Sequence, residues 1–147
     1  MNPPPFAQPK KGLDTTKTRC VFQHGYGTTH QHATNIFIPK GAFVVTRNDG
    51  SYWGDETFKD IQCDEKIYVW QNTMSVKQGW NSKSLHKGLC AALTGRVDSA
   101  DDQQTFSTAD FPDQMGSWAS NTVLFAHSMG NPISGAALWN GVCEKAV

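Results

Sequence analysis

The sequence has no hydrophobic run long enough to cross a membrane. Apolar stretches such as 42–45 (Ala-Phe-Val-Val) and 123–126 (Val-Leu-Phe-Ala) are four residues long, whereas a transmembrane helix needs roughly 18 or more. The N-terminus also lacks the basic start and the apolar core of about 7 to 15 residues that mark a secretion signal. We therefore expect a soluble chain with no transmembrane segment, and the sequence leaves its compartment open.

The sequence also lacks net charge. Its 13 Lys and Arg residues balance its 13 Asp and Glu residues, and the only basic cluster is Lys10-Lys11. Without a positive field to attract phosphates, nucleic acid is not expected as a partner. Cysteine is scarce, but Cys20, Cys63, Cys90 and Cys143 form an even set. An even set permits disulfides in an oxidising compartment and has no such meaning in a reducing cytosol.

The length of the chain suits one folded domain. With 147 residues, 38% of them apolar, it can bury one hydrophobic core. Four of its seven prolines lie within residues 1–18, which show no apolar periodicity, so we predict an extended arm there. The folded domain is expected to cover 19–147.

Short β-favouring stretches alternate with helical patterns along this domain. Strands are predicted over 19–23, 41–45, 66–70 and 122–126, and helices over 82–93 and 130–139, with a further helix that could begin at Thr28 or Thr29. The polar segment 96–104 is interpreted as a solvated loop. The alternation predicts an α/β fold, a parallel sheet with crossover helices. We expect the five tryptophans to pack in the core and His86 to lie on the exposed side of its helix.

Ser128 is the main candidate for chemistry. It lies in Ala126-His127-Ser128-Met129-Gly130, between the predicted strand 122–126 and the predicted helix 130–139. A serine nucleophile must be exposed on a sharp turn, and only small residues fit two positions before and after it, because the strand and the helix close on each other there. Ala126 and Gly130 meet this requirement, although a serine–glycine pair after a strand can also be a plain turn.

A second motif, Gln23-His24-Gly25-Tyr26-Gly27, follows the predicted strand 19–23. A glycine loop of this kind can supply a backbone amide to an oxyanion hole. Together the two motifs resemble those of the α/β-hydrolase superfamily, which includes lipases, esterases and thioesterases. The resemblance implies a partial α/β-hydrolase fold over 19–147.

The resemblance also implies a role for each motif residue. Ser128 corresponds to the nucleophile, and the backbone amides of Tyr26 and Met129 correspond to the oxyanion hole. The residues that would support the glycine loop and the sharp turn at Ser128 are His24, Gly25, Gly27, His127 and Gly130. The middle of the chain is also similar to lipase-like secreted proteins of unicellular eukaryotes and oomycetes, which carry cysteines at similar places. By that likeness Cys63 and Cys90 could form a disulfide, or they could be two reduced core cysteines.

The sequence departs from this superfamily after Ser128. In α/β-hydrolases the acid and the histidine of the triad follow the serine, but 129–147 contain Glu144 and no histidine. The chain thus ends before its triad is complete, with the C-terminal strands of the fold missing, as in a natural truncation or an excerpt of a longer protein. A base within the chain would have to be His24, His30, His32, His86 or His127. The spacing of His30-Gln31-His32 is explained by chance better than by a zinc site, so we expect no metal.

Two functions follow from these residues. The first is a serine hydrolase that acts on a small-molecule or lipid ester or thioester, uses no cofactor, and is weak or inactive as this chain alone. The second is a non-catalytic, hydrolase-derived module that binds a partner through the open edge of its sheet.

Overall fold

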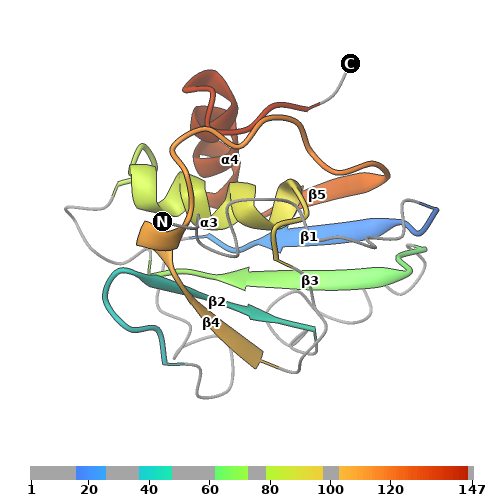
Figure 1. Cartoon of the computed structure of the whole chain (residues 1–147), viewed down its shortest axis with the longest axis horizontal. Helices are drawn as coiled ribbons and strands as arrows, with labels where there is room; N and C mark the ends of the chain where they lie inside the picture. Colours follow the sequence, from blue (N-terminus) through green and yellow to red (C-terminus); the bar gives the residue numbers. More distant parts are fainter. Residues whose placement is uncertain (1–15, 26–36, 48–61, 73–78, 98–102, 146–147) are drawn as a thin grey trace, which may run out of the picture.

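The computed structural model describes residues 16–25, 37–47, 62–72, 79–97 and 103–145 (Figure 1). Within these ranges the elements are β1 (Arg19–Gln23), β2 (Ala42–Thr46), β3 (Glu65–Trp70), α3 (Lys83–Leu93), β4 (Gln103–Ser107), a 3-10 turn (Thr108–Asp110), β5 (Thr122–Ala126) and α4 (Gly130–Trp139). The predicted ranges of β1, β5 and α4 agree with these bounds, those of β3 and α3 differ by one residue at the N-terminal end, and that of β2 is shifted by one residue at both ends. None of the helices in the described ranges is both long and apolar enough to cross a membrane.

The five described strands form one mixed sheet in the order β4-β2-β3-β1-β5. β1 is parallel to both of its neighbours, β3 and β5, whereas β2 is antiparallel to β3 and to β4. The predicted partial α/β-hydrolase fold, with a parallel sheet and crossover helices, is therefore wrong. A short apolar strand has the same residue pattern in either direction, so the alternation along the sequence could not show that β2 runs against its neighbours.

β4 is the strand that the sequence did not predict. It begins inside the segment 96–104, which was interpreted as a solvated loop, and of its side chains only Phe106 is buried. As an outer strand of the sheet it has one paired edge, along β2, and its polar residues remain in contact with solvent. A strand that buries one side chain shows too little apolar alternation to be recognised from its composition.

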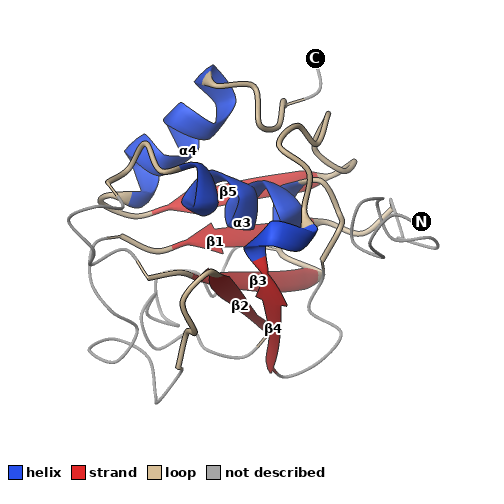
Figure 2. Ribbon diagram, turned by 60° about the vertical axis from the view of Figure 1, so that its left-hand side comes forward, coloured by secondary structure: helices blue, strands red, loops and turns tan. Residues whose placement is uncertain are grey.

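Both described helices cover the same face of the sheet, as Figures 1 and 2 show. The main core on this face combines strand residues such as Val21, Ile67 and Val69 with Leu89 of α3 and Ile133 of α4. The opposite face carries a second cluster, made of Cys20, Phe22, Val44, Tyr68 and Trp70. The described helices therefore cover one face of the sheet and do not cross over on both faces.

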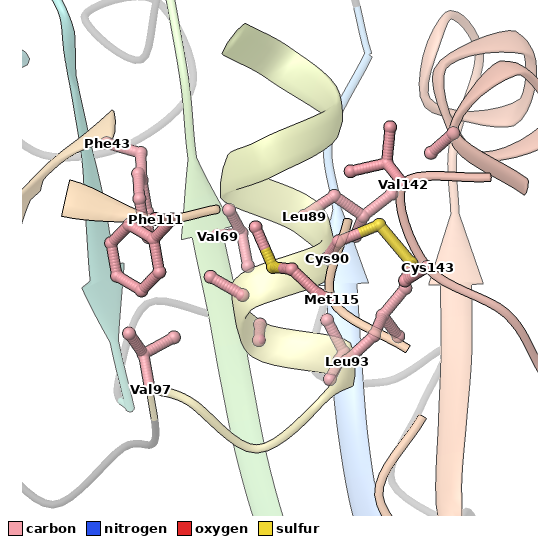
Figure 3. Close-up of a cluster of buried hydrophobic side chains, with 14 of the residues drawn as sticks. Phe43, Val69, Leu89, Cys90, Leu93, Val97, Phe111, Met115, Val142 and Cys143 are labelled. Atoms are coloured by element: carbon pink, nitrogen blue, oxygen red, sulfur yellow. A yellow bond between two sulfur atoms is a disulfide. The ribbon is translucent and has the colours of Figure 1, made fainter. Parts of the chain in front are cut away.

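Two disulfides join segments that are distant in the sequence. Cys20 of β1 is bonded to Cys63, and Cys90 of α3 is bonded to Cys143, which Figure 3 shows within the main core. Cys63 and Cys90 are therefore neither bonded to each other nor reduced, so both alternatives predicted for them are wrong. Cys63 packs against the second cluster and Cys90 belongs to the main core, so the two sulfurs lie on opposite faces of the sheet.

Two further expectations about side chains need correction. His86 is buried, with 1% of its surface exposed, on the face of α3 that was expected to be solvated. Trp70 is buried as expected, but Trp80 and Trp139 are 51% and 90% exposed. Trp53, the helix expected from Thr28 or Thr29 and most of the arm 1–18 fall outside the described residues.

Candidate functional site

Ser128 lies on a sharp turn between β5 and α4. Its φ is +56°, and Asn121 is the only other described non-glycine residue with a positive φ. The left-handed conformation costs an L-residue about 1 to 2 kcal/mol and persists only where the surroundings impose it. The turn is closed by two backbone hydrogen bonds, from Gly130 N–H to the His127 carbonyl (2.9 Å) and from Asn131 N–H to the Ser128 carbonyl (3.0 Å). The serine is exposed, as a nucleophile must be.

Gly25 lies directly against this turn. A Cβ on Gly25 would come within 2.7 Å of Ser128 Cβ and 2.8 Å of the His127 carbonyl oxygen. Real Cβ atoms essentially never approach other atoms so closely, so only glycine fits here. The loop after β1 and the turn after β5 are thus pressed together, as the two sequence motifs require if they build one site.

Gly130 makes the equivalent contact from the helix side. A Cβ on Gly130 would lie 2.5 Å from the Gln23 carbonyl oxygen, so the first residue of α4 touches the end of β1. The same carbonyl accepts a hydrogen bond from His127 N–H (3.2 Å). Gly130 and His127 therefore hold the turn against β1.

The backbone amide of Met129 is a donor without an acceptor in the described part of the chain. Met129 precedes the first residue of α4, where backbone N–H groups have no intrahelical partner and the helix dipole favours negative charge. Its nitrogen would lie 3.2 Å from a Cβ on Gly25, so it faces the glycine loop. The role of this amide as an oxyanion-hole donor stays a prediction; the second expected donor, Tyr26, and the neighbouring Gly27 lie outside the described residues.

His24 fixes the glycine loop to the sheet. The Gln71 backbone N–H donates to His24 Nε2 (2.9 Å), which must therefore be the unprotonated nitrogen. The proton is then on Nδ1, which donates to the Gly25 carbonyl (2.8 Å). The imidazole is 3% exposed and stacks on Trp70 at 5.4 Å. With both nitrogens occupied, His24 is a support of the loop and not a free base.

Two buried glutamines extend this support, and sequence reasoning did not find them. Gln71 Nε2 donates to Gln23 Oε1 (2.7 Å), and Gln23 Nε2 donates to the His24 carbonyl (3.0 Å). Gly88 of α3 leaves the space that the Gln71 side chain occupies. The only sequence signal was the position of Gln23 and Gln71, each directly after or at the end of an apolar strand, where a buried amide needs a specific partner.

No described side chain accepts a hydrogen bond from Ser128 Oγ. His86 Nε2 donates to the Trp80 carbonyl (3.0 Å), and burial lowers the pKa of His86 below its ordinary value, partly offset by that carbonyl. His127 is exposed beside Ser128 in the chain, and His30 and His32 lie outside the described residues. The described residues also contain no group of three potential metal ligands. A base for Ser128 is thus not assigned.

A pocket of about 320 Å³ opens at the same edge of the sheet as Ser128. It lies where β3 ends and α3 begins, and its lining includes Gln71, Asn72, Ser84 and Thr108. β3 and β5 are two strand spacings apart, so the side of the pocket formed by Gln71 is about 10 Å from the turn, and the rest of the lining is farther away. A substrate held by Ser128 could extend into it.

Comparison with known proteins adds no relative. No family model matches this chain, and no curated protein or solved structure matches it significantly.

Proposed function

We propose that this protein is a serine hydrolase of esters or thioesters, with Ser128 as the nucleophile. The observation that carries the proposal is the left-handed turn at Ser128, wedged between Gly25 and Gly130. A strained turn with no room for a side chain at Gly25 or Gly130 is expected where a hydroxyl must be presented to a substrate. The likeness of the two motifs to α/β-hydrolases supports the chemistry, while the mixed sheet leaves that superfamily relationship a proposal.

The proposed reaction has two steps. Ser128 Oγ attacks the acyl carbon and loses its proton to a base, and the alcohol or thiol leaves with that proton as the acyl-serine forms. Met129 N–H donates to the carbonyl oxygen as negative charge develops on it. Water, deprotonated by the same base, then releases the acid and restores the serine. None of these steps requires a cofactor.

Turnover is expected to be slow without an aligned base. The described residues supply an exposed hydroxyl and one amide donor, and no partner for the hydroxyl proton. In serine proteases, loss of triad members still leaves roughly 10³ to 10⁴-fold catalysis over water from the oxyanion hole and binding. Acylation by a reactive ester or phosphonate is therefore a better first measurement than steady-state hydrolysis.

A fluorophosphonate probe tests the proposal. Mass spectrometry of the labelled protein should place the adduct on Ser128, and Ser128→Ala should abolish it. The matched control is Ser120→Ala, which removes an exposed serine from the turn at the other end of β5 and should label normally. Labelling that persists in Ser128→Ala, or none at all in the folded protein, would remove Ser128 from this role.

The base can be sought in the same preparation. Hydrolysis of p-nitrophenyl acetate should be measured for the parent chain and for single alanine variants of the five histidines. Robust turnover that disappears in Ser128→Ala and in one histidine variant would identify an internal base and contradict the expectation of an incomplete triad.

The second candidate function is a binding module, favoured by the outer position of β5 in the described sheet. Val123 of this strand is 43% exposed. An outer strand of a sheet can accept a strand from another molecule. Size-exclusion chromatography with light scattering distinguishes the candidates, because a stable monomer that labels at Ser128 favours the hydrolase.

A further inference from the structure

A second pocket, of about 570 Å³, lies away from the proposed nucleophile between the start of α3 and the end of α4. Asn81, Lys83, His86, Asp113, Gln114, Asn140 and Val142 line it. Asn140 follows α4, and ten residues of helical rise place it about 15 Å from the turn at Ser128. The proposed hydrolase chemistry assigns no role to this pocket.

The two charged residues that line this pocket, Lys83 and Asp113, form an ion pair with each other. Asp113 forms ion pairs with Lys83 (3.0 Å) and with Lys87 (3.2 Å), and these lysines hold the pKa of the Asp113 carboxyl below its ordinary value. An anion would have to displace the carboxylate, and a cation would meet two ammonium groups. The chemistry of the lining therefore favours a neutral ligand.

The remaining polar groups offer both donors and acceptors. Asn140 Nδ2 donates to Asn81 Oδ1 (2.9 Å), which leaves the Asn81 amide hydrogens and the Asn140 oxygen for a ligand. Gln114 makes no hydrogen bond in the described part of the chain. A ligand rich in hydroxyl groups can use such a mixture, because each hydroxyl both donates and accepts.

His86 points to a ligand independently of these exposed side chains. Its ring is 1% exposed, its Nε2 donates to the Trp80 carbonyl, and its Nδ1 has no hydrogen-bond partner in the described residues. In the neutral ring Nδ1 is an acceptor, and burial favours the neutral form by lowering the pKa of His86. An acceptor of a pocket-lining residue that has no partner among the described residues is suited to a hydroxyl donor.

Two exposed tryptophans flank the hydrogen-bonded asparagines in the chain. Trp80 precedes Asn81 and Trp139 precedes Asn140, and their side chains are 51% and 90% exposed. Large aromatic rings are costly to leave in water and pack well against flat apolar surfaces. A sugar ring presents such a surface of C–H groups together with a rim of hydroxyls.

We propose that this pocket binds a neutral saccharide, with Asn81, Gln114, His86 and Asn140 contacting its hydroxyls and Trp80 and Trp139 packing on its rings. The site does not include Ser128, so this proposal can be tested separately from the proposed hydrolase activity. It suits an extended ligand, since several polar groups line one opening and an exposed tryptophan precedes each of the two lining asparagines in the chain.

Titration of the protein with cellohexaose, maltohexaose and chitin hexaose tests the proposal, with tryptophan fluorescence and calorimetry as readouts. At least one should bind saturably and shift the emission. Trp139→Ala and Asn140→Ala should each weaken its affinity about tenfold, which is about 1.4 kcal/mol. The matched control Asn72→Ala, an amide in the other pocket, should leave the affinity unchanged.

Three results would overturn the proposal. They are absence of binding by all three saccharides at millimolar concentration, binding that Trp139→Ala and Asn140→Ala leave intact, and competition by inorganic phosphate, which would indicate an anion site. Because Trp139 is 90% exposed, its replacement should leave the unfolding midpoint unchanged, so weaker binding by that variant is not a folding defect.

Discussion

Gly25 and Ser128, 103 positions apart in the sequence (128 minus 25), are in contact so close that a single methyl group on Gly25 would lie 2.7 Å from Ser128 Cβ. This contact joins the loop after β1 to the turn after β5. It is possible because the two strands are adjacent and parallel, with Gln23 paired to Ala126, so that their carboxyl ends lie together. The geometry of the proposed nucleophile therefore depends on a residue far from it in the chain.

Gly25→Ala should damage the proposed chemistry more than the fold. The new methyl group meets backbone atoms of His127 and Met129, which cannot rotate away, so the turn must move. A shift of about 1 Å at a reacting group can cost on the order of 10²-fold in rate. The rate of fluorophosphonate labelling should fall by about that factor.

Gly79→Ala is the matched control for this loss, because a Cβ there meets nothing within 4 Å. It should label at the parental rate. If Gly25→Ala also labelled at that rate, the loop after β1 would have no part in the site.

Two glycines of α4 should respond to alanine in opposite ways. Gly130→Ala places a methyl group 2.5 Å from the Gln23 carbonyl oxygen, and overpacking of this kind costs about 1 to 3 kcal/mol. Gly135→Ala meets nothing within 4 Å, so the better helix propensity of alanine should raise the free energy of unfolding by about 0.5 to 1 kcal/mol. Urea denaturation of both variants measures the difference, and equal effects would contradict the close approach of α4 to β1.

Local patterns predicted local structure well. The strand at 19–23, the strand at 122–126 and the helix at 130–139 have the predicted bounds because each is an apolar stretch bounded by glycine or polar residues. The direction of β2 and the existence of β4 could not be predicted, since the first depends on pairing with distant residues and the second buries only Phe106 among its side chains.

The same distinction applies to the site. The sharp turn at Ser128 and the small residue Gly130 were predicted because a serine turn demands small residues at fixed spacings, and Gly25 was singled out by the glycine motif after β1. Gln71 was not, because its hydrogen bond to Gln23 joins two strands that only the folded sheet brings together. The prediction for Cys63 and Cys90 was wrong for a related reason. The residues near Cys63 in the sequence do not show on which face of the sheet it lies.

Arg19 should be the most sensitive charged residue for stability. Its guanidinium is 0% exposed and donates to the Thr122 hydroxyl (3.0 Å) and to the Ala92 carbonyl at the end of α3 (3.1 Å). Arg19→Met removes both of these charged hydrogen bonds, so we expect a loss of about 3 kcal/mol in the free energy of unfolding. Glu65→Gln is the control: the carboxylate is 3.9 Å from Arg19 Nε and 32% exposed, so its loss should cost less than about 1 kcal/mol. Similar costs for both variants would contradict this ranking.

Stability should fall as the pH falls below 6.5 because of His86. Burial depresses the pKa of His86 below its ordinary 6.5, so between these two values the unfolded chain binds more protons than the folded one. The contribution of neutral His86 to the free energy of unfolding is complete above about pH 6.5 and is lost as the pH falls through the folded-state pKa. Asp113 has a depressed pKa as well, but its ordinary value is 3.8, so it acts in a lower range.

The measurement is urea denaturation from pH 7.5 to pH 5, with His86→Gln as the comparison. The variant should be less sensitive to pH than the parent over this range. If both lost stability in parallel, other groups would be responsible and the burial of His86 would not be the cause.

Reduction should unfold the chain or nearly so, because both disulfides close long loops. The bonded cysteines are 43 and 53 positions apart, and the chain-entropy model gives about 4 kcal/mol for each loop of that size, a large part of the stability of a small domain. Cys143→Ser should be the more damaging single change, because Cys90 and Cys143 are both 0% exposed and the variant leaves a hydroxyl and a thiol in the main core. Cys63→Ser removes the other bridge at its partly buried end, so it serves as the comparison.

Peptide mapping of the oxidised protein should recover Cys20 with Cys63 and Cys90 with Cys143. A Cys63–Cys90 peptide would instead place these two residues on the same face of the sheet and contradict the arrangement of both clusters.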